Sequence, residues 1–299
     1  MKHVVYILLF FIPNFLLSQQ TYIYTNYNLN KVIYNPALCG LEDFAEAGFN
    51  IRNQWSGLDG APQTQIFTIN GPIKNKNMGL GGNVFSDQLG AESRIGFSLN
   101  YSYSLKLNDD LNLSLGLSAG IIQYKLDNTV VNPFENNDPV FSSVGFSNIV
   151  PDATFGLYLY QDDFFFGLSI PQLLQTQFTL SEDNISLTGG LVNHYYLNTG
   201  YKFEINDKLE VEPSLLFKYT PSTKSQFDIS SLFIYEEKYW GGFSYRHEES
   251  VVLLLGCEVN DKMSFGYSYD FLTSGLNTVS SGSHELKLSF RFSNFNIIK

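Results

Sequence analysis

The segment "LNLSLGLSAGI" at residues 111–121 strongly limits what this chain can fold into, because its apolar residues fall on every second position. Leucine, alanine or isoleucine occupies each odd position, and asparagine, serine or glycine occupies each even one. A period of two residues places successive side chains on opposite faces of a β-strand. The alternating segment is also longer than a typical strand of a soluble protein. The segment therefore predicts a long strand with one apolar face and one face of small polar residues.

The same alternation recurs along the chain. It is found at residues 95–105, 209–219, 239–248, 263–271 and 285–292. In a soluble sandwich the polar face is solvated and usually carries many charges, whereas here it consists mostly of serine, glycine and asparagine. Small polar side chains suit the lumen of a membrane barrel whose apolar face meets lipid. Because lipid cannot satisfy backbone polar groups, such a sheet must close. We therefore predict an all-β, closed antiparallel transmembrane barrel of the outer membrane.

Composition supports a membrane barrel. The chain has 26 Phe and 19 Tyr, and aromatic and charged residues each make up 16% of it. So many aromatic residues with so little charge are typical of a barrel with aromatic girdles at both membrane interfaces. The net charge of −11 disfavours nucleic acid as a partner.

Turn signals divide the chain into about 14 strands. Short acidic turns recur at 106–111, 160–164, 205–209, 235–239 and 259–263, and longer connections are expected at 127–150, 171–186 and 272–282. The strands expected between them are 44–55, 62–71, 78–86, 92–105, 110–125, 152–160, 163–170, 187–204, 208–220, 226–235, 238–247, 250–259, 262–271 and 283–292. Bacterial barrels have an even strand number, short periplasmic turns and long extracellular loops. Both chain termini are then expected in the periplasm.

The N-terminal region is expected to divide into three parts. Residues 1–18 have a basic start at Lys2, an apolar stretch and a small residue, Ser18, which is typical of a secretory signal peptide. Removal of this segment would take away the positive charge of Lys2 and change the net charge of the chain from −11 to −12. Residues 19–43 show no clear period, and we expect them either to fill the lumen or to lie at its periplasmic mouth. Residues 44–299 are predicted to form the barrel, in contact with outer-membrane lipid.

Several charged residues fall on the predicted lumen faces. They are Arg52, Arg94, Arg246, Arg291, Glu210, Glu212, Glu248 and Glu285. Charges inside a membrane barrel need partners. Two interpretations stay open, a salt-bridged lumen that keeps the barrel rigid and a pathway for a charged solute, and we favour the first.

Signals for catalysis and for metal binding are weak. The sequence has no P-loop, GxGxxG or HExxH motif. His247 with Glu248 and Glu249 would need further ligands to hold a metal. We therefore predict no enzyme, no cofactor and no metal. Cys39 and Cys257 are expected to be small buried or lipid-facing residues, with a disulfide between them as the alternative.

Two regions carry a resemblance to a known family. The stretch 34–73 contains Asn35, Pro36, Ala37 and Gly40, then Arg52, Gln54 and Trp55, then Gly57, Gly60, Pro62 and Thr64. The C-terminal part contains Tyr269 and Asp270 in "FGYSYDF" and His284 and Glu285 in "SGSHELKL". With "MGLGGNVFSDQLG" between them, these motifs resemble the PorP/SprF family of Bacteroidetes type IX secretion and gliding proteins. The resemblance implies motif residues that are either structural or in direct contact with a partner.

The resemblance also implies a function. It suggests an outer-membrane barrel that docks or anchors exported proteins with a C-terminal type B sorting domain at the cell surface, in some members together with periplasmic machinery. We expect Pro36 to pin the segment ahead of the barrel, Arg52 to lie in the lumen and Trp55 to anchor at the outer interface. Apolar residues of the long loops are candidates for partner contact: Phe134, Phe141, Phe146, Leu173, Leu174 and Phe178. The alternative function is a passive outer-membrane channel or solute transporter.

Overall fold

A computed structural model describes residues 27, 30–73, 77–127, 146–182, 185–221 and 223–292. Its strands are β1 (Ala45–Asn53), β2 (Gln63–Ile73), β3 (Met78–Leu89), β4 (Glu92–Lys106), β5 (Asn112–Leu126), β6 (Phe146–Tyr160), β7 (Phe164–Ile170), β8 (Gln177–Glu182), β9 (Ile185–Gly190), β10 (Tyr195–Tyr201), β11 (Phe203–Asn206), β12 (Leu209–Tyr219), β13 (Gln226–Tyr235), β14 (Tyr239–Arg246), β15 (Ser250–Asn260), β16 (Met263–Leu272) and β17 (Ser283–Phe292). Three short 3₁₀ helices are η2 (Lys31–Ile33), η3 (Pro36–Leu38) and η6 (Gly275–Thr278).

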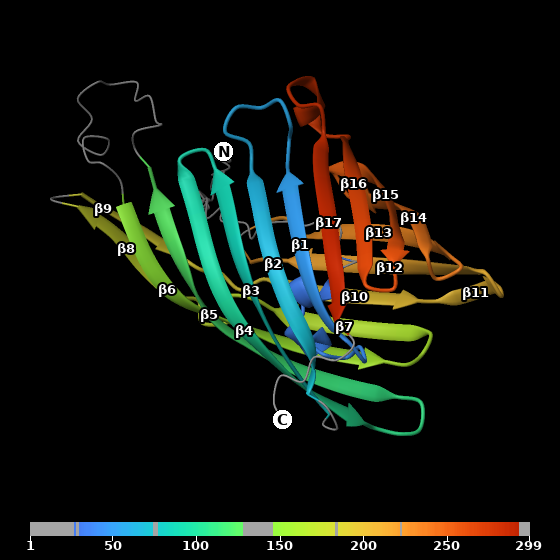
Figure 1. Ribbon diagram of the computed structural model, residues 1–299. Coiled ribbons are helices and arrows are strands. Elements are labelled where there is room, and N and C mark those ends of the chain that lie inside the picture. The colour runs from blue at the N-terminus through green and yellow to red at the C-terminus, as the bar shows by residue number, and fades with distance from the viewer. Residues whose placement is uncertain are drawn as a thin grey trace, which may run out of the picture.

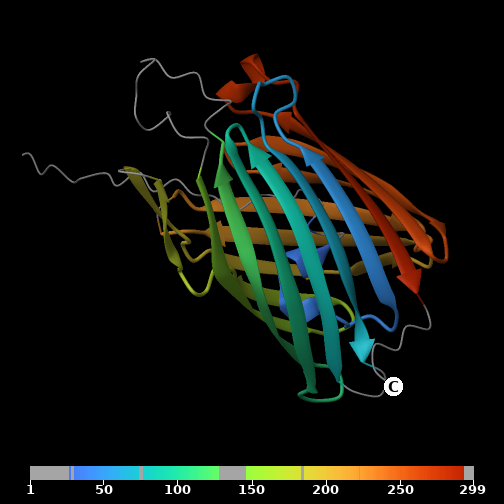
Figure 2. The same cartoon turned by 60° about the vertical axis from the view of Figure 1, so that its left-hand side comes forward.

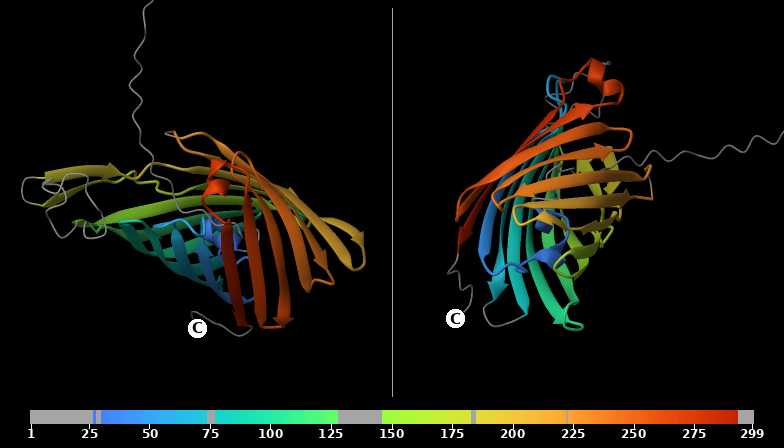
Figure 3. Two further views of the ribbon diagram at one scale, coloured as in Figure 1. Left: turned by 90° about the horizontal axis from the view of Figure 1, so that it is seen from above. Right: turned by 90° about the vertical axis from the view of Figure 1, so that its right-hand side faces the viewer.

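The strands form a closed antiparallel barrel (Figures 1 and 2). Sequence neighbours pair around most of the ring, β1 pairs with β17, and β10 pairs with β12 to complete it. β10 and β11 both pair with β12 on either side of Lys202, so they are two parts of one wall strand. The wall therefore has 14 strands, which confirms the predicted fold and strand number. Seen from above in Figure 3, the wall surrounds the two short 3₁₀ helices η2 and η3.

The two faces of the opening segment point as predicted. Leu117 and Ile121 on β5 are exposed on the outer surface, whereas Ser114 and Ser118 are buried on the inner one. Outside the barrel, the exposed apolar side chains form the surface that contacts lipid in a membrane barrel. Inside, small side chains leave room for a second layer of chain.

Two predicted strand boundaries are wrong. β6 begins at Phe146, so the loop expected at 127–150 ends earlier, and Phe146 lies in a strand instead of in that loop. The strand predicted at 187–204 is divided, because residues 185–190 form β9, which pairs with β8 in a separate two-stranded sheet. Tertiary pairing, which local sequence preference does not determine, decides which strand each piece joins.

The two ends of the barrel differ in their connections. The five predicted short turns all join consecutive wall strands at one end, which we call the short-turn end. The loops 54–62 and 273–282 and the β8–β9 hairpin lie at the other, the long-loop end (Figure 1). A search of the described residues for a helix with the length and hydropathy of a membrane span finds none.

Candidate functional site

A segment inside the barrel, residues 30–44, fills part of the lumen, and we call it the plug (Figures 2 and 3). Asn35 initiates η3, since its side-chain oxygen accepts a hydrogen bond from Ala37 N at 3.0 Å. Pro36 occupies the first helical position, where its missing N–H is not needed. Asn35 also donates from Nδ2 to the carbonyl oxygens of Leu157 and Leu168. The Asn35-Pro36-Ala37 motif therefore fixes the plug to the inner wall.

Glycine on the wall is what lets the plug lie so close. A Cβ on Gly116 would lie 2.2 Å from Ala37 N, and one on Gly156 would lie 2.1 Å from Asn35 Oδ1. Both distances are far below contact distance, so only glycine fits opposite the motif. Gly116 and Ser114 on β5 and Gly156 on β6 are thus small because the plug packs against them.

Wall hydroxyls satisfy the carbonyl groups of the plug. Ser114 donates to Ala37 O at 2.6 Å, Ser102 donates to Cys39 O at 2.5 Å, and Ser169 donates to Tyr34 O at 2.5 Å. Buried backbone groups outside regular ladders need such partners. Cys39 and Cys257 are both free thiols, and Cys39 is buried within the plug.

Residues of the N-terminal and C-terminal motifs meet in an ion cluster beside the plug. Arg52 Nη2 lies 2.7 Å from Asp270 Oδ2, and Arg52 Nη1 lies 3.3 Å from Glu285 Oε2. The β1–β17 register sets Arg52 directly opposite Glu285. Asn30 of the plug donates to Asn50, and Asn50 donates to Glu285. Motif residues more than 200 positions apart in the sequence are therefore joined through the lumen.

The cluster continues through residues outside the motifs. Arg246 bonds Asp270 at 3.2 Å and Asp228 at 3.2 Å, and Lys218 bonds Asp228 at 3.1 Å. Arg246 also pairs with Glu249 at 3.2 Å. Arg246 was expected in the lumen, but sequence reasoning missed Asp228. Asp228 lies on the polar side of β13, and pairing β13 with β14 sets it opposite Arg246. The alternation along β13 is the feature of the sequence that could have placed Asp228 in the lumen.

The other predicted lumen charges are distributed around the barrel. Arg94 bonds Glu92, Arg291 bonds Glu258, Lys202 pairs with Glu210, and Lys31 pairs with Glu212. The prediction for Glu248 is wrong. β14 ends at Arg246, the chain turns, and Glu248 is exposed and pairs with Lys224. Alternation does not extend through a turn, so Glu249 takes the inward position.

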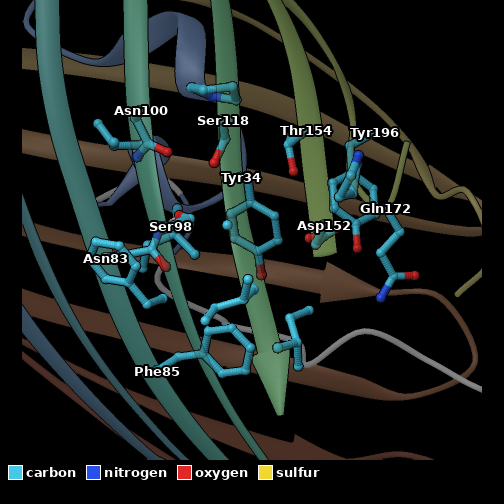
Figure 4. Close-up of a pocket in the computed structure, with 18 residues that line it drawn as sticks. Tyr34, Asn83, Phe85, Ser98, Asn100, Ser118, Asp152, Thr154, Gln172 and Tyr196 are labelled. Atoms are coloured by element: carbon cyan, nitrogen blue, oxygen red, sulfur yellow. Dashed lines mark hydrogen bonds between the residues drawn. The ribbon is translucent and has the colours of Figure 1, made fainter. Parts of the chain in front are cut away.

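Three of the cavities formed by the described residues lie along the interior, between the short-turn end and the long-loop end. The short-turn cavity, about 420 Å³, is lined by plug residues and by the β6–β7 turn. A small cavity of about 80 Å³ lies between the plug and the wall, with Tyr34, Asn100, Ser118 and Asp152 around it (Figure 4). The mouth cavity, about 500 Å³, opens at the long-loop end and is lined by residues that include Lys218 and Glu249 of the ion cluster.

The remaining motif residues have structural contacts. β1 ends at Asn53, so Trp55 lies just after the strand instead of at its end. It lines the mouth cavity instead of facing outward as the expected interfacial anchor. Pro62 O accepts a bond from Gln54 N, and Thr64 donates to Asp87 at 2.6 Å. The hydroxyl of Tyr269 donates to Ser281 O, and His284 Nδ1 lies 2.7 Å from the hydroxyl of Tyr267.

His194 also lines the mouth cavity. Its side chain is buried, and burial lowers the pKa of this imidazole below its ordinary value of 6.5. Its Nδ1 lies 2.8 Å from the carbonyl oxygen of Val192.

Candidate contact residues of the loops are only partly placed. Leu173 and Leu174 lie at the base of the β8–β9 hairpin and are exposed. Phe178 is part of β8. Phe134 and Phe141 fall outside the described residues.

Within the described ranges, no group of three or more His, Cys, Asp or Glu side chains could hold a metal ion. Residues 116–120 do match the pattern Gly-x-Ser-x-Gly of hydrolases. That pattern needs a strand-to-helix turn, whereas Ser118 lies in the middle of β5.

Comparisons with known proteins agree on a membrane barrel. A model of the family "Type IX secretion system membrane protein PorP/SprF" matches residues 16–290. The toluene transporter TbuX of Ralstonia pickettii is 13% identical with a TM-score of 0.55, over 87% of this chain and 92% of that one. The monoaromatic hydrocarbon channel CymD is 13% identical with a TM-score of 0.54, over 89% and 92%. At these identities the likeness shows the fold alone. Curated protein sequences give no match.

Proposed function

This chain belongs to the PorP/SprF family of type IX secretion system membrane proteins, and from that premise we propose that it docks an exported protein at the cell surface. The exported partner would carry a C-terminal type B sorting domain. The family and the fold are those of an outer-membrane barrel, not of an enzyme. In the proposed orientation the short turns face the periplasm and the long-loop end faces outward, as in other bacterial barrels.

The plug and the ion cluster inside the lumen are the observation that carries this proposal. The plug is bonded to the wall through Asn35, Ser102, Ser114 and Ser169. The ion cluster beside it involves buried groups whose separation would leave charges unpaired. Such an interior favours a rigid scaffold that presents its rim to a partner over a channel that conducts solutes.

The long-loop end offers apolar surface for that contact. Leu173 is 38% and Leu174 is 52% exposed on the segment that leads into the hairpin. Adjacent exposed apolar side chains on a loop often mark an interface with another protein. We therefore propose these two leucines as part of the docking surface.

Affinity purification tests the proposal. The barrel is tagged after Lys299, extracted from outer membranes in mild detergent, and its co-purifying proteins are identified by mass spectrometry. We expect a large exported protein with a sorting domain. Periplasmic ring components without cargo would instead assign the barrel to the core machinery.

Paired variants test the docking surface. Changing Leu173 and Leu174 to serine should release the cargo from a folded barrel. Changing Leu58 and Val279 to serine removes two exposed apolar residues from other loops of the same end and should leave the cargo bound. A cargo-free barrel that conducts ions in planar bilayers would favour the channel function instead.

A further inference from the structure

Aromatic rings form one wall of the short-turn cavity. Tyr158, Tyr160, Phe164 and Phe165 line it from β6, β7 and the ends of the turn between them. The rings of Tyr158 and Phe165 stack with centroids 5.8 Å apart, and those of Tyr158 and Tyr160 lie 5.6 Å apart. Stacked rings present a flat wall whose faces are electron-rich, which attracts cations.

The cavity already binds one organic cation, which comes from the plug. The ammonium group of Lys31 lies 4.2 Å from the centroid of the Phe165 ring. The same group lies 3.1 Å from Glu212 Oε1. The ring face of Phe165 and the carboxylate of Glu212 together therefore bind an ammonium group in this cavity.

Further carboxylates of the cavity are not neutralised. Five acidic residues line it, Glu42, Glu46, Asp162, Asp163 and Glu212, against two lysines, Lys31 and Lys202. Lys202 pairs with Glu210, and Glu46 pairs with Lys287. Over the part of the chain that the structure describes, no ion pair involves Glu42, Asp162 or Asp163.

We propose that the short-turn cavity is a receptor for a lysine or arginine side chain on a basic segment of another protein. The charge of the cavity is complementary to such a segment, and its aromatic wall accommodates the apolar stem of either side chain. A metal ion is a poor alternative occupant, since these carboxylates do not form a group that could hold one among the described residues. A segment bound here would also touch Lys31 and Leu38 of the plug.

This inference concerns the end of the barrel opposite the proposed cargo site. It takes from the proposed function only the orientation, in which the partner is periplasmic. The test below uses the purified full chain without cargo, so its outcome is independent of whether the cargo proposal holds.

The test measures binding of a fluorescein-labelled peptide of alternating arginine and serine to the detergent-solubilised barrel by fluorescence anisotropy. Asp162→Asn together with Asp163→Asn should weaken binding about tenfold, since two charge contacts are lost. The matched control is Asp109→Asn with Asp110→Asn, which makes the same charge change on the neighbouring β4–β5 turn. The control should bind within about twofold of the natural chain.

A second pair of variants tests the aromatic wall. Tyr160→Leu should weaken binding about threefold through loss of a ring face. Tyr239→Leu removes a ring that is 50% exposed at the same end outside the cavity and should have no effect. Heat-modifiable mobility on gels confirms that each variant is folded. Equal losses in both aspartate pairs, or no binding of the peptide at low salt, would overturn the proposal.

Discussion

Replacing Arg52 with methionine should strongly destabilise the barrel. The guanidinium group bonds Asp270 and Glu285, and the side chains of all three residues are at most 1% exposed. Breaking a buried ion pair on one side costs about 3–5 kcal/mol, because the partner is left charged and unpaired. Asp270 keeps Arg246 at 3.2 Å, and Glu285 keeps the bond from Asn50. We therefore expect the lower end of that range, about 3 kcal/mol.

Urea unfolding in lipid vesicles, followed by tryptophan fluorescence, measures this cost. Adding Glu285→Gln to the Arg52→Met variant should recover about half of the lost free energy, since the buried negative charge that Arg52 balances is removed. Lys208→Met breaks an ion pair with Glu236 in an exposed turn and should leave the unfolding midpoint unchanged. An Arg52→Met barrel as stable as the natural chain would refute the idea that the cluster holds the wall together.

Three further outcomes are expected. Gly116→Leu should displace the plug and raise single-channel conductance in planar bilayers, whereas Gly275→Leu, where a Cβ meets nothing within 4 Å, should not. A maleimide reagent should label Cys39 only after unfolding in the natural chain, but in the native state of the Gly116→Leu variant. The pKa of His194 is lower in the folded chain than in the unfolded chain, so the unfolded chain takes up a proton first as the pH falls through 6.5. The free energy of unfolding should therefore decline below that pH. Urea midpoints between pH 7.5 and 5 should show a smaller decline for His194→Gln, and an unchanged slope would contradict this assignment.

Sequence reasoning predicted the barrel because its signal is local. The alternation along β5 indicates which side chains face lipid and which face inward. Counting strands between the turn signals predicts an even number of strands. It also placed Arg52 and Glu285 in the lumen. It did not predict β9 or the early start of β6, since both depend on which neighbour each strand pairs with.

The sequence by itself determined the closed sheet, the direction of each face and the need for paired charges inside. Only the tertiary structure decided which charges meet and where residues 30–44 lie. The short-range pattern carries no information on contacts such as Arg52 with Asp270, because they depend on how the ring closes. Likewise, Gly116 is small because Ala37 lies against it, and only the folded chain shows those two residues together.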